Sequence, residues 1–282
     1  MFLSVIIATH NRYEAMVCLY ENLKKQHVKP DEIIIVDSSD IAGGGYDWFK
    51  DDWILKERHI EGACLTRQRN LGIDALDERS DIAAFIDDDV LLENDFFKII
   101  SDIYKEDNNA EISGLGGFVT GEDEDFKYFY QKPVLIKNNE VYKTKTLYGC
   151  NMIYRRKVVM NERFDENLLF YGFQEDRDFS LRANKYGLVV RTKHARLRHL
   201  RVKSGRIDRL KLGFSLLGNP YYIMKKHGDS VLRIQYHLLH SFTIIMLKAI
   251  FKKEHRACLM GAFIALKQIL SGKFCPQNIK FL

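Results

Sequence analysis

Three consecutive carboxylates, Asp87, Asp88 and Asp89, are the clearest candidates for chemistry in this 282-residue chain. They directly follow the apolar segment Ala83–Ile86, and like charges crowded at the end of a buried strand repel one another unless a cation lies between them. Hard divalent cations prefer carboxylate oxygens together with phosphate oxygens and water. Because alternate residues of an extended segment point to the same side, Asp87 and Asp89 are the expected ligand pair, with Asp88 turned away.

The same three residues also have a purely structural interpretation, an acidic turn before the next helix, for which Asn94 and Asp95 are competing caps. A second carboxylate pair, Glu175 and Asp176, has two interpretations as well. Acidic residues favour a helix N-terminus through the helix dipole, and a positioned carboxylate can act as a general base. The residues alone leave these alternatives open.

Alternating strand and helix patterns in the first 120 residues predict the framework that carries these groups. We expect strands at Phe2–Ala8, Ile33–Val36 and Ile82–Ile86, and helices at 13–27 and 66–76. Nearly continuous apolar strands separated by helices are typical of a parallel sheet covered on both faces. Ligands bind such sheets at the carboxyl ends of the strands, so Thr9–Arg12, Asp37–Asp40 and Asp87–Asp89 are expected to lie together.

A different pattern begins near residue 111. We expect a glycine-rich strand at 112–120, an acidic patch at Glu122–Asp125, a helix at 175–186 that ends at Gly187, a strand at 188–192, and apolar helices at 231–251 and 257–270. Neither apolar helix has the ~18 uninterrupted apolar residues of a spanning helix, so neither is expected to cross a membrane.

The composition indicates a folded protein with a substantial core, because 46% of the residues are hydrophobic and 29% are charged. Four prolines and 18 glycines exclude collagen-like and low-complexity chains, and a net charge of +5 does not indicate a dedicated nucleic-acid-binding protein. The five cysteines are scattered without the spacing of a zinc site, as is typical of buried thiols in a reducing compartment. The apolar N-terminus lacks the basic region of a signal peptide, so a cytoplasmic location is expected.

A basic stretch runs from Arg191 to Lys211, where nine Lys or Arg and one acid give a formal charge of +8. It is interpreted as a solvated face, as a loop that closes over phosphates, or as a surface attracted to anionic membranes, since two amphipathic helices follow it. It contains no aromatic residue, which disfavours nucleic-acid binding. The run Gly43–Gly45 lacks the pattern of a phosphate loop and is expected to be a flexible connection.

The ordered segments SVIIATHNR, IIIVDSSD, LTRQRNLGIDAL and DIAAFIDDDV resemble the family 2 glycosyltransferases of GT-A fold. The later segments YGCNMIYRRKVV and FDENLLFYGFQEDRDFSLRANKYGLVV resemble the G-x-N and E-D segments of that family, so the resemblance covers residues 3–200. It implies a Rossmann-like α/β domain with a mostly parallel sheet over 1–205, which binds a nucleotide sugar, and a helical C-terminal extension over 206–282.

The resemblance also implies roles for the matching residues. Nucleotide-binding roles fall on Thr9, Asn11, Arg12, Asp37, Arg67, Arg69, Asp87 and Asp88. A divalent cation, Mn²⁺ or Mg²⁺, would be held by Asp87, Asp89 and His199 and would stabilise the departing diphosphate. Asp176 would be the base that accepts the acceptor's proton, with Glu175 positioning it or the acceptor. Against this, a lone histidine such as His199 is more often structural.

The implied activity is inverting transfer of a sugar from a nucleotide diphosphate to an acceptor hydroxyl, such as a lipid-linked or growing saccharide in polysaccharide biosynthesis. A UDP-sugar is the favoured donor. Ser38 stands where many uridine-binding members have a second Asp, so a dTDP-sugar is the alternative. The acceptor site is expected in the segments 120–148 and 200–230. The C-terminal helices would bind the inner membrane face, pack on the core or form a homodimer. The competing functions are a non-catalytic sugar-nucleotide or glycan-binding protein and a membrane-associated scaffold.

Overall fold

The computed structural model describes residues 1–40, 45–121, 132–137, 139–202 and 207–282. Outside them lie Gly43 and Gly44, the acidic patch Glu122–Asp125, the boundary expected at 205/206, part of the basic stretch, and parts of both segments expected to bind the acceptor. The chain divides into two compact units. The first comprises Met1–Ala63, Arg67–Phe164 and Asp176–Gly205; the second comprises Cys64–Thr66, Asp165–Glu175 and Arg206–Leu282.

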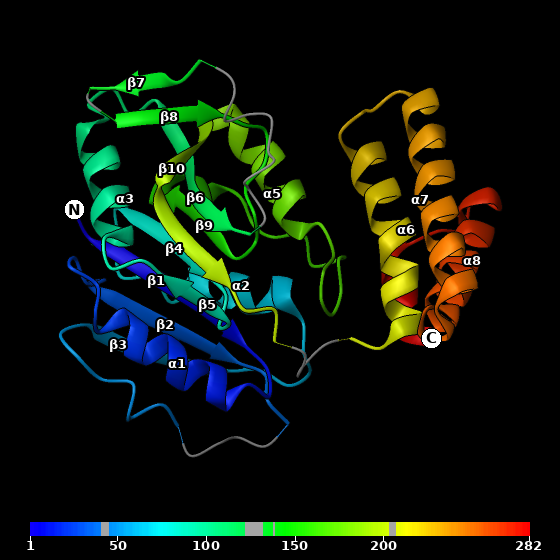
Figure 1. Cartoon of the computed structure of the whole chain (residues 1–282), viewed down its shortest axis with the longest axis horizontal. Helices are drawn as coiled ribbons and strands as arrows, with labels where there is room; N and C mark the ends of the chain where they lie inside the picture. The colour runs from blue at the N-terminus through cyan, green and yellow to red at the C-terminus, as the bar shows by residue number, and fades with distance from the viewer. Residues whose placement is uncertain (41–44, 122–131, 138, 203–206) are drawn as a thin grey trace. The chain divides into compact units, whose positions relative to one another are not determined.

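A mixed sheet of ten strands, counted over the described residues, forms the frame of the first unit (Figure 1). The strands are β1 (Leu3–Thr9), β2 (Glu32–Asp37), β3 (Ile54–His59), β4 (Ile82–Ile86), β5 (Val90–Leu92), β6 (Ile112–Thr120), β7 (Val134–Ile136), β8 (Asn139–Lys143), β9 (Asn151–Arg155) and β10 (Leu188–His199). Their order is β3-β2-β1-β4-β9-β6-β10-β8-β7, with β5 paired to β10. The first four of that order are mutually parallel, so their carboxyl ends meet at one edge.

Beyond β4 the sheet contains both antiparallel and parallel pairs. β9 is antiparallel to both β4 and β6, whereas β6 and β10 are parallel to each other. The short strand β5 pairs antiparallel with the end of β10, so that Val90 lies opposite His199. This pairing brings the C-terminal end of β10 to the residues that immediately follow β4.

The sheet is covered on both faces, as the nearly unbroken apolar strands predict. On one face Leu3, Val5 and Ile7 of β1 pack in a core with helices α1 (Tyr13–Leu23) and α3 (Phe96–Glu106). On the other face Ile6 packs in a core with α2 (Leu65–Asp74), α4 (Arg156–Asn161) and α5 (Glu175–Ala183). The period-2 alternation of a strand therefore sends successive side chains of β1 into two different cores.

Three long helices build the second unit, α6 (Arg209–Lys226), α7 (Val231–Phe251) and α8 (Arg256–Leu270), followed by a 3₁₀ segment at Pro276–Phe281. The helices expected at 231–251 and 257–270 are confirmed, whereas α6 was not foreseen, because Pro220 and two glycines interrupt its pattern. Asp208 caps α6 by accepting a hydrogen bond from the backbone N–H of Lys211. Two segments from within 1–205, Cys64–Thr66 and Asp165–Glu175, cluster with these helices.

Helix α7 is the one described helix that has both the length and the average composition of a membrane-spanning helix, with 21 residues and a mean hydropathy of 1.2. Only 11% of its most apolar window is buried. The polar side chains His240, Ser241 and Thr243 interrupt the apolar residues of α7, which is why the sequence predicts no membrane span there. By length and mean hydropathy alone, however, α7 qualifies, and a single helix of this kind is weak support for a span.

Helices α6 and α8 approach so closely that glycine is required at the crossing. A Cβ atom at Gly261 would lie 1.9 Å from the carbonyl oxygen of Leu210, and one at Gly213 would lie 1.8 Å from the carbonyl oxygen of Cys258. Backbone atoms cannot yield as a flexible side chain can, so any larger residue must push the two helices apart.

We predict that Gly261→Ala destabilises the second unit by about 2 kcal/mol, because overpacking separates α6 from α8. A loss of stability distinguishes overpacking from helix propensity, because helix propensity alone favours alanine over glycine by about 1 kcal/mol. Urea unfolding followed by circular dichroism measures the difference. The control, Lys267→Ala on the exposed side of α8, should change stability by less than about 0.5 kcal/mol. A stabilised Gly261→Ala protein would contradict the close crossing.

Candidate active site

The segments after β1, β2 and β4 converge at the carboxyl edge of the sheet, as expected. Thr9, the last residue of β1, pairs in register with Asp37, the last residue of β2. The Thr9 hydroxyl donates a 2.7 Å hydrogen bond to Asp88 Oδ2, and Arg12 Nη1 donates one of 2.7 Å to Asp88 Oδ1. The residues that precede α1 are thereby attached to the three carboxylates that follow β4.

Asp88 is buried in the protein, where Arg12 Nη1 lies near both Asp88 and Asp89. The Asp88 side chain is 2% exposed, and both of its oxygens bond to Thr9 and Arg12. Burial raises the pKa of Asp88 to about 6, against the opposing effect of the Arg12 guanidinium. In the structure Asp88, assigned to nucleotide binding from the sequence, contacts protein groups and orients Thr9 and Arg12.

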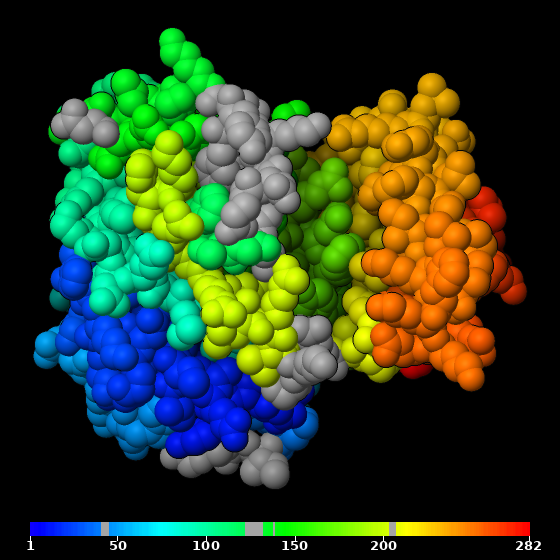
Figure 2. Space-filling view, in the orientation of Figure 1, coloured from blue at the N-terminus to red at the C-terminus, as the bar shows by residue number. Residues whose placement is uncertain are grey.

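Asp87, Asp89 and His199 form the cluster that the sequence predicts for a divalent cation. One ligand atom from each lies within 4.8 Å of the others. The pairing of β5 with β10 places His199 there, and the backbone N–H of Leu200 donates to the Asp89 carbonyl at 2.8 Å. Figure 2 shows the end of β10 (yellow-green) lying against the N-terminal residues (blue), consistent with the 3.4 Å bond from Arg12 Nη2 to the Val202 carbonyl.

The two oxygens of Asp89 have different environments. Oδ2 accepts a 2.9 Å hydrogen bond from the backbone N–H of Val202 and lies 3.6 Å from Arg12 Nη1. Oδ1 is buried and lies 3.1 Å from His199 Nε2, yet within the described residues it accepts no well-aligned hydrogen bond. Burial opposes ionisation, but His199 and Arg12 hold the pKa of Asp89 below its ordinary value. A buried, ionised oxygen that lacks a donor fits a cation ligand.

Arg69 and Asp176 both bond to the backbone of Gly149. Arg69 Nη2 donates to the Gly149 carbonyl at 2.9 Å and to Asp87 Oδ1 at 3.2 Å. The backbone N–H of Gly149 in turn donates to Asp176 Oδ2 at 2.9 Å, while Asp176 Oδ1 accepts from the N–H of Arg177 at 2.7 Å. Burial raises the pKa of Asp176 above its ordinary value, although these two hydrogen bonds oppose the rise.

Asp37 is also held by protein groups. Its Oδ1 accepts from the N–H and the hydroxyl of Ser39, and its Oδ2 accepts from the Tyr46 hydroxyl at 3.0 Å. Ser38, which departs from the common uridine-binding pattern, is buried, and its hydroxyl donates to the Thr9 carbonyl at 3.3 Å. Asn11 has a left-handed backbone, with φ of 54°, and its N–H donates to the Ser39 hydroxyl at 2.8 Å.

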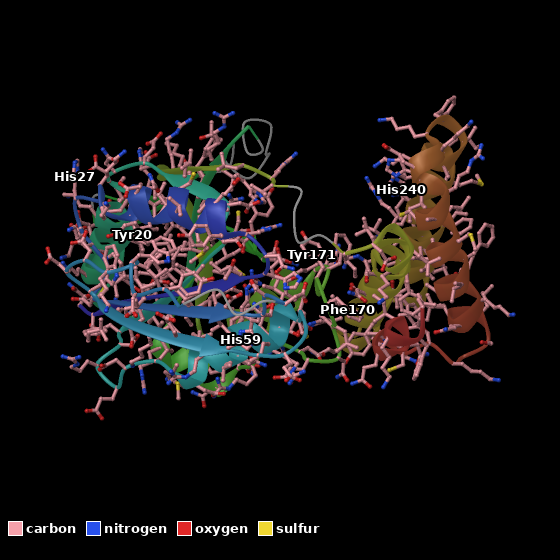
Figure 3. The ribbon with its side chains drawn as sticks, turned by 90° about the horizontal axis from the view of Figure 1, so that it is seen from below. Tyr20, His27, His59, Phe170, Tyr171 and His240 are labelled. Carbon is pink, nitrogen blue, oxygen red and sulfur yellow. The ribbon has the colours of Figure 1, made fainter. Side chains whose placement is uncertain are left out.

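Of the remaining residues assigned from the sequence, some contact the cluster and others do not. Of the alternatives Arg67 and Arg69, only Arg69 contacts the cluster, whereas Arg67 is exposed on α2. Glu175 is buried and belongs to the second unit, and its backbone N–H donates to the Gly172 carbonyl at 2.8 Å. Among the other histidines, His10 lies 2.8 Å from the Ser38 carbonyl through Nδ1, whereas His27 and His59 are exposed on the first unit and His240 lies on α7 (Figure 3).

Two residues that sequence reasoning missed help to build the site. Gln68 donates to the carbonyls of both Thr9 and Val36, at 2.8 and 2.9 Å, and so ties the ends of β1 and β2 together. The sequence signal that could have identified Gln68 was its position between Arg67 and Arg69, in a segment that resembles the family. Tyr46, which holds Asp37, lies beyond a glycine-rich connection and no motif marks it.

Comparison with known proteins identifies relatives of this architecture. A family model described as Glycosyl transferase family 2 matches residues 4–162, and no curated protein matches. Among solved structures, Staphylococcus aureus TarS is 17% identical, with a TM-score of 0.60, over 87% of this chain and 42% of that one. The mannosyltransferase PcManGT from Pyrobaculum calidifontis, in complex with GDP-Man and Mn²⁺, is 13% identical, with a TM-score of 0.63, over 96% of this chain and 88% of that one.

A third structure, GalNAc-T7 with UDP, GalNAc and Mn²⁺, is 12% identical, with a TM-score of 0.61, over 84% of this chain and 56% of that one. This chain thus spans less than half of the TarS chain and little more than half of the GalNAc-T7 chain. At these identities the solved structures establish the α/β fold.

We predict that Asp89→Ala lowers the affinity for Mn²⁺ by at least about tenfold, because it removes the buried oxygen aimed at His199. Electron paramagnetic resonance of free Mn²⁺ measures the affinity directly. The matched control is Asp95→Ala, which breaks an exposed His–Asp pair with His27 at 2.6 Å and should leave the affinity unchanged. Equal affinities for the two variants would show that the cluster does not hold the cation.

Proposed function

Because the chain belongs to the family 2 glycosyltransferases, we propose that it transfers a sugar from a nucleotide diphosphate to an acceptor hydroxyl, with inversion at the transferred carbon. The observation that carries the proposal is the proximity of two different carboxylate centres. Asp87 and Asp89 form a cluster with His199, and Arg69 and the Gly149 peptide connect Asp87 to Asp176. One centre suits the donor's diphosphate, and the other suits the acceptor's proton.

The donor side uses the cation cluster and the arginines around it. Asp87, Asp89 and His199 would hold Mn²⁺ or Mg²⁺, which when bound stabilises the negative charge on the departing diphosphate. Arg12 and Arg69 are already anchored on Asp88 and Asp87, so their guanidinium groups need little further ordering to assist. We favour a UDP-sugar donor, with a dTDP-sugar as the alternative that Ser38 leaves open.

The acceptor side uses Asp176 as the base that removes the hydroxyl proton while the new C–O bond forms. Two backbone N–H groups fix the carboxylate, and its raised pKa makes it a stronger proton acceptor than an exposed Asp. Glu175, the preceding residue, positions this base or the acceptor. Inversion follows when one base acts on the face opposite the departing nucleotide.

We further propose that the acceptor is a lipid-linked or growing saccharide and that the enzyme works in the cytoplasm at the inner face of the membrane. The support is the exposed apolar surface of the second unit, where Leu232, Tyr236 and Leu239 of α7 are 70–78% exposed. Such a surface suits an interfacial helix. A homodimer that covers the same side chains is the competing use of α7.

We predict that calorimetric titration detects UDP binding in the presence of Mn²⁺, and that EDTA or Asp89→Ala abolishes it, because the diphosphate binds through the cation. Parallel titrations with dTDP and GDP identify the base, and Asp95→Ala serves as the control that keeps binding. If none of the three nucleotides binds in a metal-dependent way, the transferase proposal is wrong.

We predict that Asp176→Asn lowers turnover by at least about 100-fold while UDP binding is retained, because the amide cannot accept the proton. Burial raises the pKa of Asp176. As the pH decreases, turnover of the parent enzyme should therefore begin to fall while the pH is still above about 4, the ordinary pKa of Asp. The carboxylate is the active form, so activity is lost as the pH decreases. Donor-consumption assays across pH test both statements.

The control for this experiment is Asp102→Asn, at a carboxylate on α3 that pairs with Lys98 at 2.7 Å and should leave turnover unchanged. Undiminished turnover of Asp176→Asn would remove Asp176 from the mechanism. An absence of turnover in the parent enzyme with every donor and acceptor tried, together with intact UDP binding, would favour the non-catalytic binding protein.

A further inference from the structure

Helices α6 and α7 line a cavity of about 360 Å³ that the proposed transfer reaction does not use. Residues 173–174 and the start of α8 complete its walls, and all of these segments belong to the second unit. The wall residues of α6 recur every three or four positions and form one stripe of the helix: Arg209, Leu212, Leu216 and Pro220. A cavity of this size accommodates a small organic molecule.

One end of the cavity is cationic. Helices α6 and α7 lie side by side and run in opposite directions, joined by residues 227–230 (Figure 1). The start of α6 is therefore beside the end of α7, so Arg209 and Lys248 line the same end of the cavity. Helix α8 begins at this end as well, where His255 and Cys258 line the wall. Two cations and an imidazole are thus gathered at one end.

The charges at this end produce a positive potential. Within the described part of the chain neither Arg209 nor Lys248 takes part in an ion pair, and no carboxylate lines the cavity. His255 occupies the N-cap position of α8 and makes no side-chain cap hydrogen bond, so the positive end of that helix dipole adds to the potential. Together these groups favour a ligand with more than one negative charge.

The acids closest in sequence do not cancel this potential. Asp208 uses its side chain to cap α6 by accepting from the Lys211 N–H. Glu254 lies 3.6 Å from His255 Nε2, and its side chain is 64% exposed. Solvent and salt screen such an exposed charge.

The buried thiol of Cys258 is close to both cations. Cys258 is 2% exposed, and although burial raises the pKa of its thiol, the charges of Arg209 and Lys248 both act to lower it. Both cations therefore lie near one point of the wall. A single acidic group bound there can contact both.

Beyond the cationic end the walls are apolar. Side chains from both helices form them: Leu212, Leu216, Ile244 and Ile245. A free inorganic anion gains nothing from these walls, whereas a molecule with an acidic group at one end and an apolar body at the other contacts both parts of the cavity. The wall residues of α7 lie on the opposite side of that helix from its exposed apolar residues Leu232, Leu239 and Ile250. A dissolved molecule, and not a bilayer that rests on those residues, therefore fits the cavity.

We propose that this cavity binds a soluble organic phosphate, with Arg209 and Lys248 contacting the phosphate and the leucine and isoleucine side chains contacting its apolar body. A phosphate monoester suits the two cations best, because it carries close to two negative charges at neutral pH and offers three acceptor oxygens. A carboxylate carries one charge and balances one of them. The site lies wholly in the second unit and goes beyond the proposed transfer reaction.

The test uses phenyl phosphate as the probe and the full chain as the protein. Calorimetric titration is performed in EDTA, so that no divalent cation recruits the phosphate to the cluster of Asp87 and Asp89. Two variants of equal charge are compared. Arg209→Gln/Lys248→Gln removes the cations of the cavity, and Lys252→Gln/Lys253→Gln removes two exposed cations just beyond α7 that do not line it. Thermal unfolding confirms that both variants keep the fold.

We expect phenyl phosphate to bind the parent chain at least about tenfold more tightly than the cavity variant, roughly the effect of one charge-assisted contact. The control variant should bind within about twofold of the parent chain, because exposed charges contribute little. Equal affinities of the two variants, or no binding to the parent chain, would overturn the proposal.

A third variant separates the cavity from its surface cations. Ser241→Leu fills the cavity from the α7 side and leaves Arg209 and Lys248 in place. We expect this variant to lose binding of phenyl phosphate by at least about tenfold, because the apolar body no longer fits. Unchanged binding would place the phosphate outside the cavity and overturn the proposal.

Two smaller probes separate the two halves of the ligand. Inorganic phosphate lacks the apolar body and phenol lacks the charge, so we expect each to bind at least about tenfold more weakly than phenyl phosphate. Inorganic phosphate that binds as tightly as phenyl phosphate would identify a site for a free anion. Phenol that binds as tightly would identify a purely apolar cavity. Either result would overturn the assignment to an organic phosphate.

Discussion

Three adjacent carboxylates at the end of a buried strand cannot all face one another without a counter-charge, and the site is organised around this constraint. Each carboxylate is matched to a partner from a different part of the chain. Asp87 meets Arg69 of α2, Asp88 meets Arg12 before α1, and Asp89 meets His199 at the end of β10. Because these partners are distant in sequence, the charge balance of a single tripeptide fixes the relative positions of β1, α2, β4 and β10. Within the described residues, Oδ1 of Asp89 lies 3.1 Å from His199 Nε2 but accepts no well-aligned hydrogen bond, which suits the proposed cation ligand.

The position of the proposed base, Asp176, depends indirectly on the same pairing of carboxylates with partners. The Gly149 carbonyl accepts from Arg69 and the Gly149 N–H donates to Asp176, so the backbone of this one residue relates the position of Asp176 to that of Arg69. Arg69 is itself fixed by Asp87. A cation bound at Asp87 would compete with Arg69 for that carboxylate and would bear on the Gly149 peptide. The donor and acceptor halves of the proposed reaction are therefore connected through three side chains and the backbone of Gly149.

The sequence was sufficient to predict those parts of the fold that follow a single strong hydrophobic pattern. β1, β2 and β4 are nearly continuous apolar segments, so their type, their burial and the convergence of the groups after them could be predicted. β3 was missed, because the ILKERH segment lies at the sheet edge with four of its six residues exposed and follows no apolar pattern. Tyr46 could not be found, since it reaches Asp37 through tertiary packing alone. The grouping of Asp87 with Asp89 was predicted from extended geometry, whereas Asp88 and Asp89 form a turn, and the bonds of Asp88 to Thr9 and Arg12 require the register between strands.

The residues that directly precede the proposed base, Asp176, belong to the second unit. Three residues just before Asp176 have left-handed backbones, Phe170 with φ of 56°, Gly172 with 62° and Gln174 with 68°. For the two that are not glycine this conformation costs about 1 kcal/mol or more each. Hydrogen bonds within the second unit offset the cost, since the Leu65 N–H donates to the Phe170 carbonyl and Asn219 of α6 donates to the Phe173 carbonyl. The strained segment ends at Glu175, and Asp176 is the next residue. The chain thus reaches the proposed base through a conformation that α6 helps to hold.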